Sequence, residues 1–146
     1  MSGIPLVLDA AGLDALSAAR PPEMMRALLA EAHRRDREVL VPTVACAEVA
    51  RGAKRTRALE AAVSRHDQQR GERPPIRLVD TDFGLARQVG AILHASRSGS
   101  DRLVDAHVVA VCVPSGGGLV VTSDPDDIAA LASAVPAARI RVVSPA

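Results

Sequence analysis

The strongest constraint on this fold is an alternation of short apolar runs with longer stretches of helical periodicity. This alternation predicts an α/β domain, in which helices cover a mostly parallel sheet of four or five strands. The apolar runs that would form the strands are bounded by polar residues, proline or glycine. They comprise residues 4–8, 39–41, 76–79, 119–122 and 140–143.

The stretches between these runs carry apolar residues at the spacing of amphipathic helices. The clearest of them is residues 22–35, where Met25 and Leu29 follow this spacing. A helix that contains Glu48 and is capped by Thr43 is also predicted. Further helices are expected at residues 56–69, 83–97 and 124–134.

Residues 108–113 are ambiguous, because their β-branched side chains would also suit a buried strand. Leu103, His107 and Val111 are each four residues apart, which is the spacing of a helix face. Ser100 supplies a plausible cap. We therefore predict a helix, which places Asp105 near its start.

The length and composition predict one globular domain spanning residues 1–146, with 48% hydrophobic and 24% charged residues. No run approaches the ~18 apolar residues of a membrane span and no signal peptide begins the chain, so a cytoplasmic location is expected. A formal net charge of +1 gives no global attraction to nucleic acid. Cys46 and Cys112 lie in no metal-binding spacing, and we expect two small buried side chains.

Acidic residues stand where the predicted strands end. Asp9 ends the first apolar run and Asp124 follows the fourth, so both lie at carboxyl ends of strands, where open α/β sheets bind ligands. Glu48 follows the second strand and Asp105 precedes the fourth, each on a helix. Asp127 lies three residues beyond Asp124, on the same helical face. The sequence therefore predicts one cluster of carboxylates.

Such a cluster needs a counter-charge, because neighbouring carboxylates repel and raise one another's pKa. Mg²⁺ or Mn²⁺ prefers oxygen ligands and is commonly held by carboxylates together with a substrate phosphate. Bound ions of this kind activate water for phosphodiester hydrolysis, and no covalent protein nucleophile is then needed.

The order of these acids resembles the PIN domain. That family places an Asp after its first strand, a Glu in a helix after the second, an Asp in a later helix, and a T/S-x-D-x-x-D element after the fourth. The matching pieces here are residues 6–9, 42–52, 105–110 and 120–127. The resemblance implies a three-layer α/β/α fold with a mostly parallel sheet. Metal-binding and catalytic roles are implied for Asp9, Glu48, Asp105 and Asp124, and an accessory metal-binding role for Asp127.

Single-domain PIN proteins of this length are mostly similar to VapC toxins. This resemblance implies an endoribonuclease that depends on Mg²⁺ or Mn²⁺ and is inhibited by a VapB-like antitoxin. It also implies a homodimer. Asp9 is followed by Ala10 and Ala11, where the family often has a hydroxyl or amide side chain, and Thr122 and Ser123 can supply that support instead.

Several other residues have both a functional and a structural interpretation. Asp9 and Asp124 could simply cap helices. Glu48 stands among apolar residues, where a buried acid without a partner would be costly. His107 falls on a different helix face from Asp105, and Phe83, the only aromatic residue, is expected in the core. Candidate substrate contacts are Arg51, Lys54, Arg55, Thr122 and Ser123, and Arg34, Arg35 and Arg37 form a second basic group.

The sequence is also compatible with two other functions. One is a PIN-like scaffold that has lost catalysis and only binds. The other is a receiver-like switch module with an acidic Mg²⁺ pocket, which resembles a design with paired acids after the first strand and a lysine ending the fifth. Alanines follow Asp9 here, and the only lysine is Lys54.

Overall fold

The computed structural model describes the backbone of residues 3–68 and 76–146 and the side chains of residues 3–64 and 76–146. Within these residues, five strands form one sheet in the order β3-β2-β1-β4-β5, and every neighbouring pair is parallel. The strands are β1 (Leu6–Leu8), β2 (Val39–Pro42), β3 (Ile76–Val79), β4 (Gly117–Val121) and β5 (Arg139–Val143). This confirms the predicted α/β class, and all five expected strands are present.

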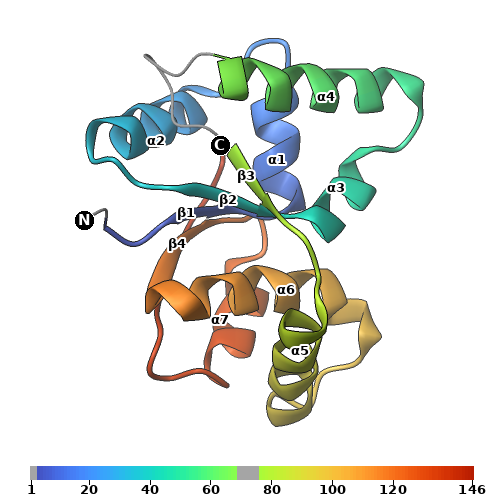
Figure 1. The fold of residues 1–146 in the computed structure, drawn as a ribbon, viewed down its shortest axis with the longest axis vertical. Coiled ribbons are helices and arrows are strands. Elements are labelled where there is room, and N and C mark those ends of the chain that lie inside the picture. Colours follow the sequence, from blue (N-terminus) through green and yellow to red (C-terminus); the bar gives the residue numbers. More distant parts are fainter. Residues whose placement is uncertain (1–2, 69–75) are drawn as a thin grey trace.

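In the part of the chain that the structure describes, seven α-helices cover the two faces of the sheet. In Figure 1, α1, α2 and α4 lie above the sheet and α5, α6 and α7 below it, while α3 packs its apolar side into the upper layer. The helices are α1 (Ala10–Ser17), α2 (Glu23–Arg34), α3 (Thr43–Val49), α4 (Ala53–Gln68), α5 (Phe83–Ala95), α6 (Leu103–Cys112) and α7 (Pro125–Ala132). Two short 3-10 segments, η1 (Ser100–Arg102) and η2 (Val113–Ser115), flank α6.

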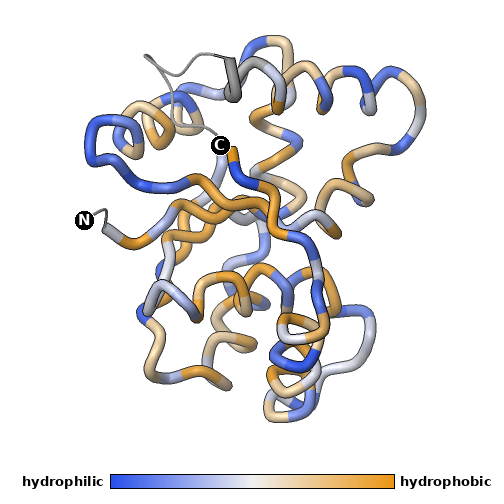
Figure 2. The backbone as a smooth tube through the Cα atoms, viewed as in Figure 1, coloured by the Kyte–Doolittle hydropathy of each residue, from blue (hydrophilic) through white to orange (hydrophobic). Residues whose placement is uncertain are grey.

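The central strand shows why the apolar runs are uninterrupted. Leu6 and Leu8 pack into the layer of α1 to α4, while Val7 packs into the layer of α5 to α7. Successive side chains of a strand point to opposite faces, so a strand covered on both faces needs apolar residues throughout. In Figure 2 the central strands are accordingly hydrophobic, and hydrophilic segments lie around the periphery.

The strand order creates a switch point between β1 and β4. From β1 the chain adds β2 and β3 on one side, and β4 and β5 then extend the sheet on the other side. Open α/β sheets bind ligands beyond the carboxyl ends of strands at such a point. A receiver-like sheet instead places β1 between β2 and β3. The strand order therefore contradicts the receiver-like alternative.

Several predicted elements differ in the structure. The helix predicted for the ambiguous residues 108–113 is confirmed as far as Cys112, and Val113 begins the 3-10 segment η2. No helix was expected at α1, although Asp9 caps it and Leu13 and Leu16 face the core. The helix expected at residues 56–69 begins earlier, at Ala53, and residue 69 lies outside the described residues. Phe83 is 79% exposed, so its assignment to the core is wrong. It occupies the first position of α5, whose buried residues, Val89 and Ile92, lie further along the helix.

The two cysteines are both free, as expected. Cys112 is buried against Val7 and Val120, and burial raises the pKa of its thiol to about 12. Cys46 packs against the core formed with α1 to α4 but is only half-buried, so the expected burial is found in full only for Cys112. Within residues 3–68 and 76–146, no helix has the length and apolar character needed to cross a membrane.

Candidate active site

Asp9, the first acid of the predicted cluster, follows β1 directly and caps α1. Its Oδ1 accepts a 2.9 Å hydrogen bond from the backbone N–H of Gly12. The residue is only 4% exposed, and burial raises its pKa, while the Thr122 hydroxyl and the backbone N–H groups of Gly12 and Ala11 favour the ionised form. A capping role leaves the second carboxylate oxygen able to serve as a ligand, so the two interpretations of Asp9 are compatible.

Thr122 connects Asp9 to the acids that follow β4. It is 1% exposed, hydrogen-bonds to the Asp9 carboxylate, and its Oγ1 accepts a 2.9 Å hydrogen bond from the N–H of Asp124. The expectation that Thr122 contacts a substrate does not fit this burial. Its position fits the alternative expectation, that it supports the carboxylates.

The residues after Thr122 open to solvent. Ser123 and Asp124 are exposed and line a hollow of about 220 Å³ together with the first turn of α7. Asp124 precedes Pro125, and its side chain makes no capping hydrogen bond to the helix. The simple capping role considered for Asp124 is therefore not seen, and its carboxylate lies at an accessible edge of the sheet.

Asp105, in the first turn of α6, lies at the electrostatic centre of the cluster. Its pKa is raised to about 6, first by burial and then by the negative charges of Asp9, Asp124, Asp127 and Glu48. The four acids therefore lie within electrostatic range of this one carboxyl group. The structure thus brings together the five acids that the sequence singled out.

Glu48 reaches the cluster from α3. It is exposed, so the expected buried acid is wrong; the helix turns Val49 toward the core instead. The prediction that Thr43 caps this helix is wrong. Thr43 is the first residue of α3, and its hydroxyl donates a 2.5 Å hydrogen bond to Oδ1 of Asp80, which follows β3. That bond ties the start of α3 to the neighbouring strand end. Of the four acids, Glu48 has the smallest effect on the pKa of Asp105.

A basic residue that sequence reasoning missed, Arg102, borders the cluster. Its Nη1 lies 2.5 Å from Oδ1 of Asp127, and the neighbouring carboxylates raise its pKa, Asp127 most. The ion pair joins the end of η1 to the first turn of α7. The sequence did contain a signal, because Arg102 lies three residues before Asp105 at the start of a predicted helix.

The basic residues predicted to contact substrate lie on α4 and at the end of α3. Arg55 forms a 2.9 Å ion pair with Asp14 of α1, and Arg51 donates a 3.1 Å hydrogen bond to the carbonyl of Ala47. Lys54 is exposed on α4. In the parts of the chain that the structure describes, none of the three forms an ion pair with the acid cluster.

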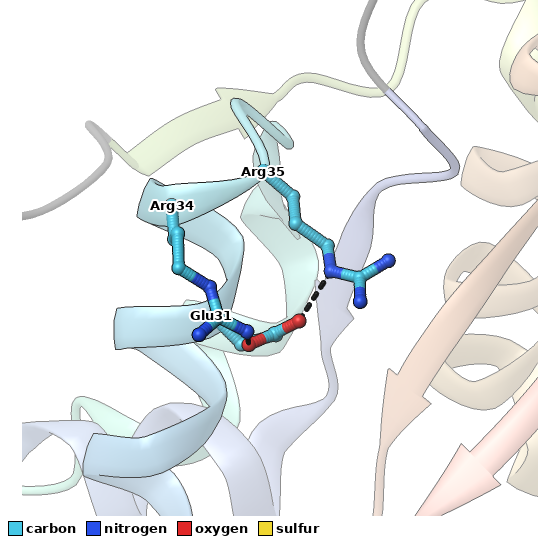
Figure 3. A network of polar contacts seen from close by, with 3 residues as sticks. All are labelled: Glu31, Arg34 and Arg35. Atoms are coloured by element: carbon cyan, nitrogen blue, oxygen red, sulfur yellow. Dashed lines mark hydrogen bonds and ion pairs between the residues drawn. The ribbon is translucent and has the colours of Figure 1, made fainter.

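The second basic group lies at the opposite edge of the sheet. Glu31 of α2 pairs with both Arg34 and Arg35, as Figure 3 shows. The end of α2 leads into the amino end of β2, whereas the acids gather at the carboxyl ends of the strands. This group is therefore a local helix network and not a rim of the acidic site.

The His107 side chain is buried and contacts the backbone of its own helix instead of the acid cluster. Its Nδ1 lies 2.7 Å from the carbonyl oxygen of Leu103, one turn earlier in α6, and the residue is 4% exposed. Its other ring nitrogen, Nε2, is buried without a hydrogen-bond partner among the described residues. The expected structural role of His107 agrees with this position.

The donor set at this edge suits a hard divalent cation. Within the described residues, no three His, Cys, Asp or Glu side chains stand close enough to enclose an ion by themselves. Mg²⁺ usually keeps several waters and takes one or two carboxylates plus a substrate phosphate, so an open set of acids suits it. The repulsion that raises the pKa of Asp105 is also what a bound cation relieves.

A family model described as the PIN domain matches residues 13–133. The matched segment includes Glu48, Asp105, Asp124 and Asp127, and Asp9 lies just before it. No curated protein is significantly similar to the chain. The match covers most of the sequence and agrees with the observed α/β architecture, so the chain belongs to the PIN-domain family.

Proposed function

We propose that the protein is a metal-dependent endoribonuclease that hydrolyses RNA phosphodiester bonds at the acidic edge of the sheet. PIN domains are generally nucleases, which supports a hydrolase acting on a nucleic acid. The observation that carries the proposal is the position of Asp105, whose pKa is raised by burial and by the charges of four other carboxylates. Repulsion of this kind destabilises the metal-free fold, and a bound cation would relieve it.

In this proposal Asp9, Glu48, Asp105 and Asp124 hold Mg²⁺ or Mn²⁺, and Asp127 is an accessory acid. A bound ion of this kind supplies a nucleophilic water and neutralises charge on the leaving oxygen. The chain contributes the orientation of the ligands. Thr122 hydrogen-bonds to both the Asp9 carboxylate and the backbone N–H of Asp124, which fixes their relative positions. The cap on α1 fixes one oxygen of Asp9.

A metal titration tests this site. At about 100 times its dissociation constant, Mn²⁺ should stabilise the folded chain by about 2.7 kcal/mol, because it binds only the folded state. For a protein of this size, that raises the thermal midpoint by roughly 5–11 °C. RNA cleavage should appear with Mn²⁺ or Mg²⁺ and disappear with EDTA.

The matched variants for this titration are Asp124→Asn and Glu31→Gln. Asp124→Asn should lose most of the metal-induced shift. Glu31→Gln also removes one carboxylate, but from the far end of α2, so it should keep the shift. Equal shifts in both variants would show that the acids form no shared metal site. A chain that binds metal without cleaving RNA would favour a binding scaffold.

We further propose that the ribonuclease is a toxin of the VapC kind and is silenced by a VapB-like partner. An exposed acidic edge readily receives a basic side chain, and the guanidinium of arginine pairs with carboxylates in a fork geometry. A partner segment that presents an arginine would therefore compete with the metal. The resemblance to VapC also supports a homodimer.

Bacterial growth tests the toxin proposal. Cells that express the wild-type chain alone should stop growing, whereas cells that express Glu48→Gln should grow, because only a cleaving enzyme depletes RNA. Co-expression of the product of the adjacent gene should restore growth. Colony counts after induction measure the effect, with protein levels matched by immunoblot. Equal toxicity of wild type and Glu48→Gln would contradict the proposal.

A further inference from the structure

We propose that Arg102 binds a phosphate of the RNA strand beside the acid cluster, and this inference rests on the proposed ribonuclease function. Arg102 ends η1, immediately before α6, and lies three residues before Asp105. Residues with this spacing lie on the same side of a helix. Its guanidinium reaches Asp127 in the first turn of α7, at 2.5 Å. Arg102 therefore bridges the two segments that carry Asp105 and Asp124.

The contact between Arg102 and the cluster has no counterpart among the other basic side chains described. Arg55 pairs with Asp14, and Arg77 pairs with Glu38 at 3.2 Å. Among the ion pairs of residues 3–64 and 76–146, only that of Arg102 involves one of the five acids. A positive charge is thus held at the edge where the negative charge is concentrated.

A stabilising role alone does not account for this pair. The side chains of Arg102 and Asp127 are 35% and 40% exposed, and solvent screens ion pairs with such exposure. A substrate requirement does account for it. Five carboxylates repel an RNA phosphate, and a fixed cation at the rim reduces this repulsion at the point of entry.

The guanidinium keeps donors available for a phosphate. It carries five N–H groups, and its contact with Asp127 is made through Nη1 alone. The Nε lies 3.8 Å from Asp101, beyond hydrogen-bond distance. An arginine with one side of its fork on a carboxylate can present the remaining donors to two phosphate oxygens. A lysine in its place would supply charge without that geometry.

The test measures binding of a labelled single-stranded RNA by fluorescence anisotropy, in Ca²⁺, at several salt concentrations, with a gel to confirm that the RNA stays intact. Arg102→Met should weaken binding about tenfold for all sequences alike. The slope of log Kd against log salt should fall by about 0.7, as expected for the loss of one phosphate contact on a single strand. Arg102→Lys should keep the slope and recover only part of the affinity.

The matched control is Arg77→Met, which breaks another exposed arginine–carboxylate pair at the amino ends of β2 and β3. It should change neither affinity nor slope. Weaker binding by Arg102→Met with an unchanged slope would overturn the proposal, because that pattern means a structural role. The proposal would also be overturned if Arg102→Met bound Mn²⁺ more tightly, measured by the thermal midpoint, and bound RNA as wild type does. Arg102 would then only neutralise the charge of the neighbouring carboxylates.

The same measurements separate this proposal from the proposed function. If wild type cleaves RNA and Arg102→Met binds RNA with the wild-type slope, only the role of Arg102 is overturned. If the wild-type chain neither binds nor cleaves RNA, both are overturned.

Discussion

Replacing Asp105 with Asn is expected to abolish RNA cleavage and, in the same variant, to stabilise the metal-free protein at neutral pH. Loss of a group that stabilises charge in a reaction typically costs about 10²–10³-fold in rate, and we expect at least that loss in kcat. Stability should rise because burial and four neighbouring carboxylates both disfavour the charged form of Asp105. A neutral amide of similar shape ends that repulsion.

The pH dependence has a definite sign. The pKa of Asp105 rises from its ordinary value of 3.8 to about 6 on folding, so the folded chain holds more protons than the unfolded chain between these values. Stability from this group therefore falls as the pH rises from about 4 to about 6 and stays low above that range. The thermal midpoint of Asp105→Asn should match wild type near pH 4 and exceed it increasingly up to about pH 7.

Thermal melts in EDTA from pH 4 to 8, beside cleavage assays in Mn²⁺, measure both effects. The control is Asp126→Asn, which removes an exposed acid next to Asp127 in the first turn of α7. This variant should leave cleavage and pH dependence unchanged. A constant difference between Asp105→Asn and wild type across this range would mean that Asp105 does not titrate near 6. Cleavage at the native rate by Asp105→Asn would mean that the active site lies elsewhere.

The largest loss of stability is expected from Gly117→Ala, at the start of β4. A Cβ at this position would lie 2.2 Å from the carbonyl oxygen of Arg139, with further backbone atoms of Arg139 within 3.0 Å. Backbone atoms in a paired strand cannot move aside as a flexible side chain can. The Gly117–Arg139 pairing between β4 and β5 would have to open. We expect a loss of about 3 kcal/mol or more in the free energy of unfolding.

Chemical denaturation monitored by circular dichroism measures this loss. Gly90→Ala is the matched control, because Gly90 lies within α5 and a Cβ there meets nothing within 4 Å. It should stabilise the protein by roughly 0.5–1 kcal/mol, since alanine is the better helix former. Equal stability of Gly117→Ala and wild type would contradict the close contact between β4 and β5.

The sequence by itself determined the sheet and the position of its acids. Apolar runs such as residues 6–8 predict buried strands, and Asp9 and Asp124 follow two of these runs directly. Parallel strands place their carboxyl ends at one edge of a sheet, so position along the chain is enough to bring such acids together. The helical spacing of residues 103–111 outweighs the β propensity of residues 108–113, and it places Asp105 near the start of a helix that leads to the fourth strand.

Only the tertiary structure decided which faces of the helices are covered and which side chains meet. Glu48 and Phe83 lie in apolar stretches and are nevertheless exposed, because the orientation of α3 and α5 against the sheet sets their burial. The pair of Arg102 and Asp127 joins residues far apart in the chain, and Thr122 is buried where β4 passes the start of α1. The periodicity of a sequence reports only which residues share a face of one helix or strand. Contacts between side chains of different elements depend on how those elements pack together, which the whole chain determines.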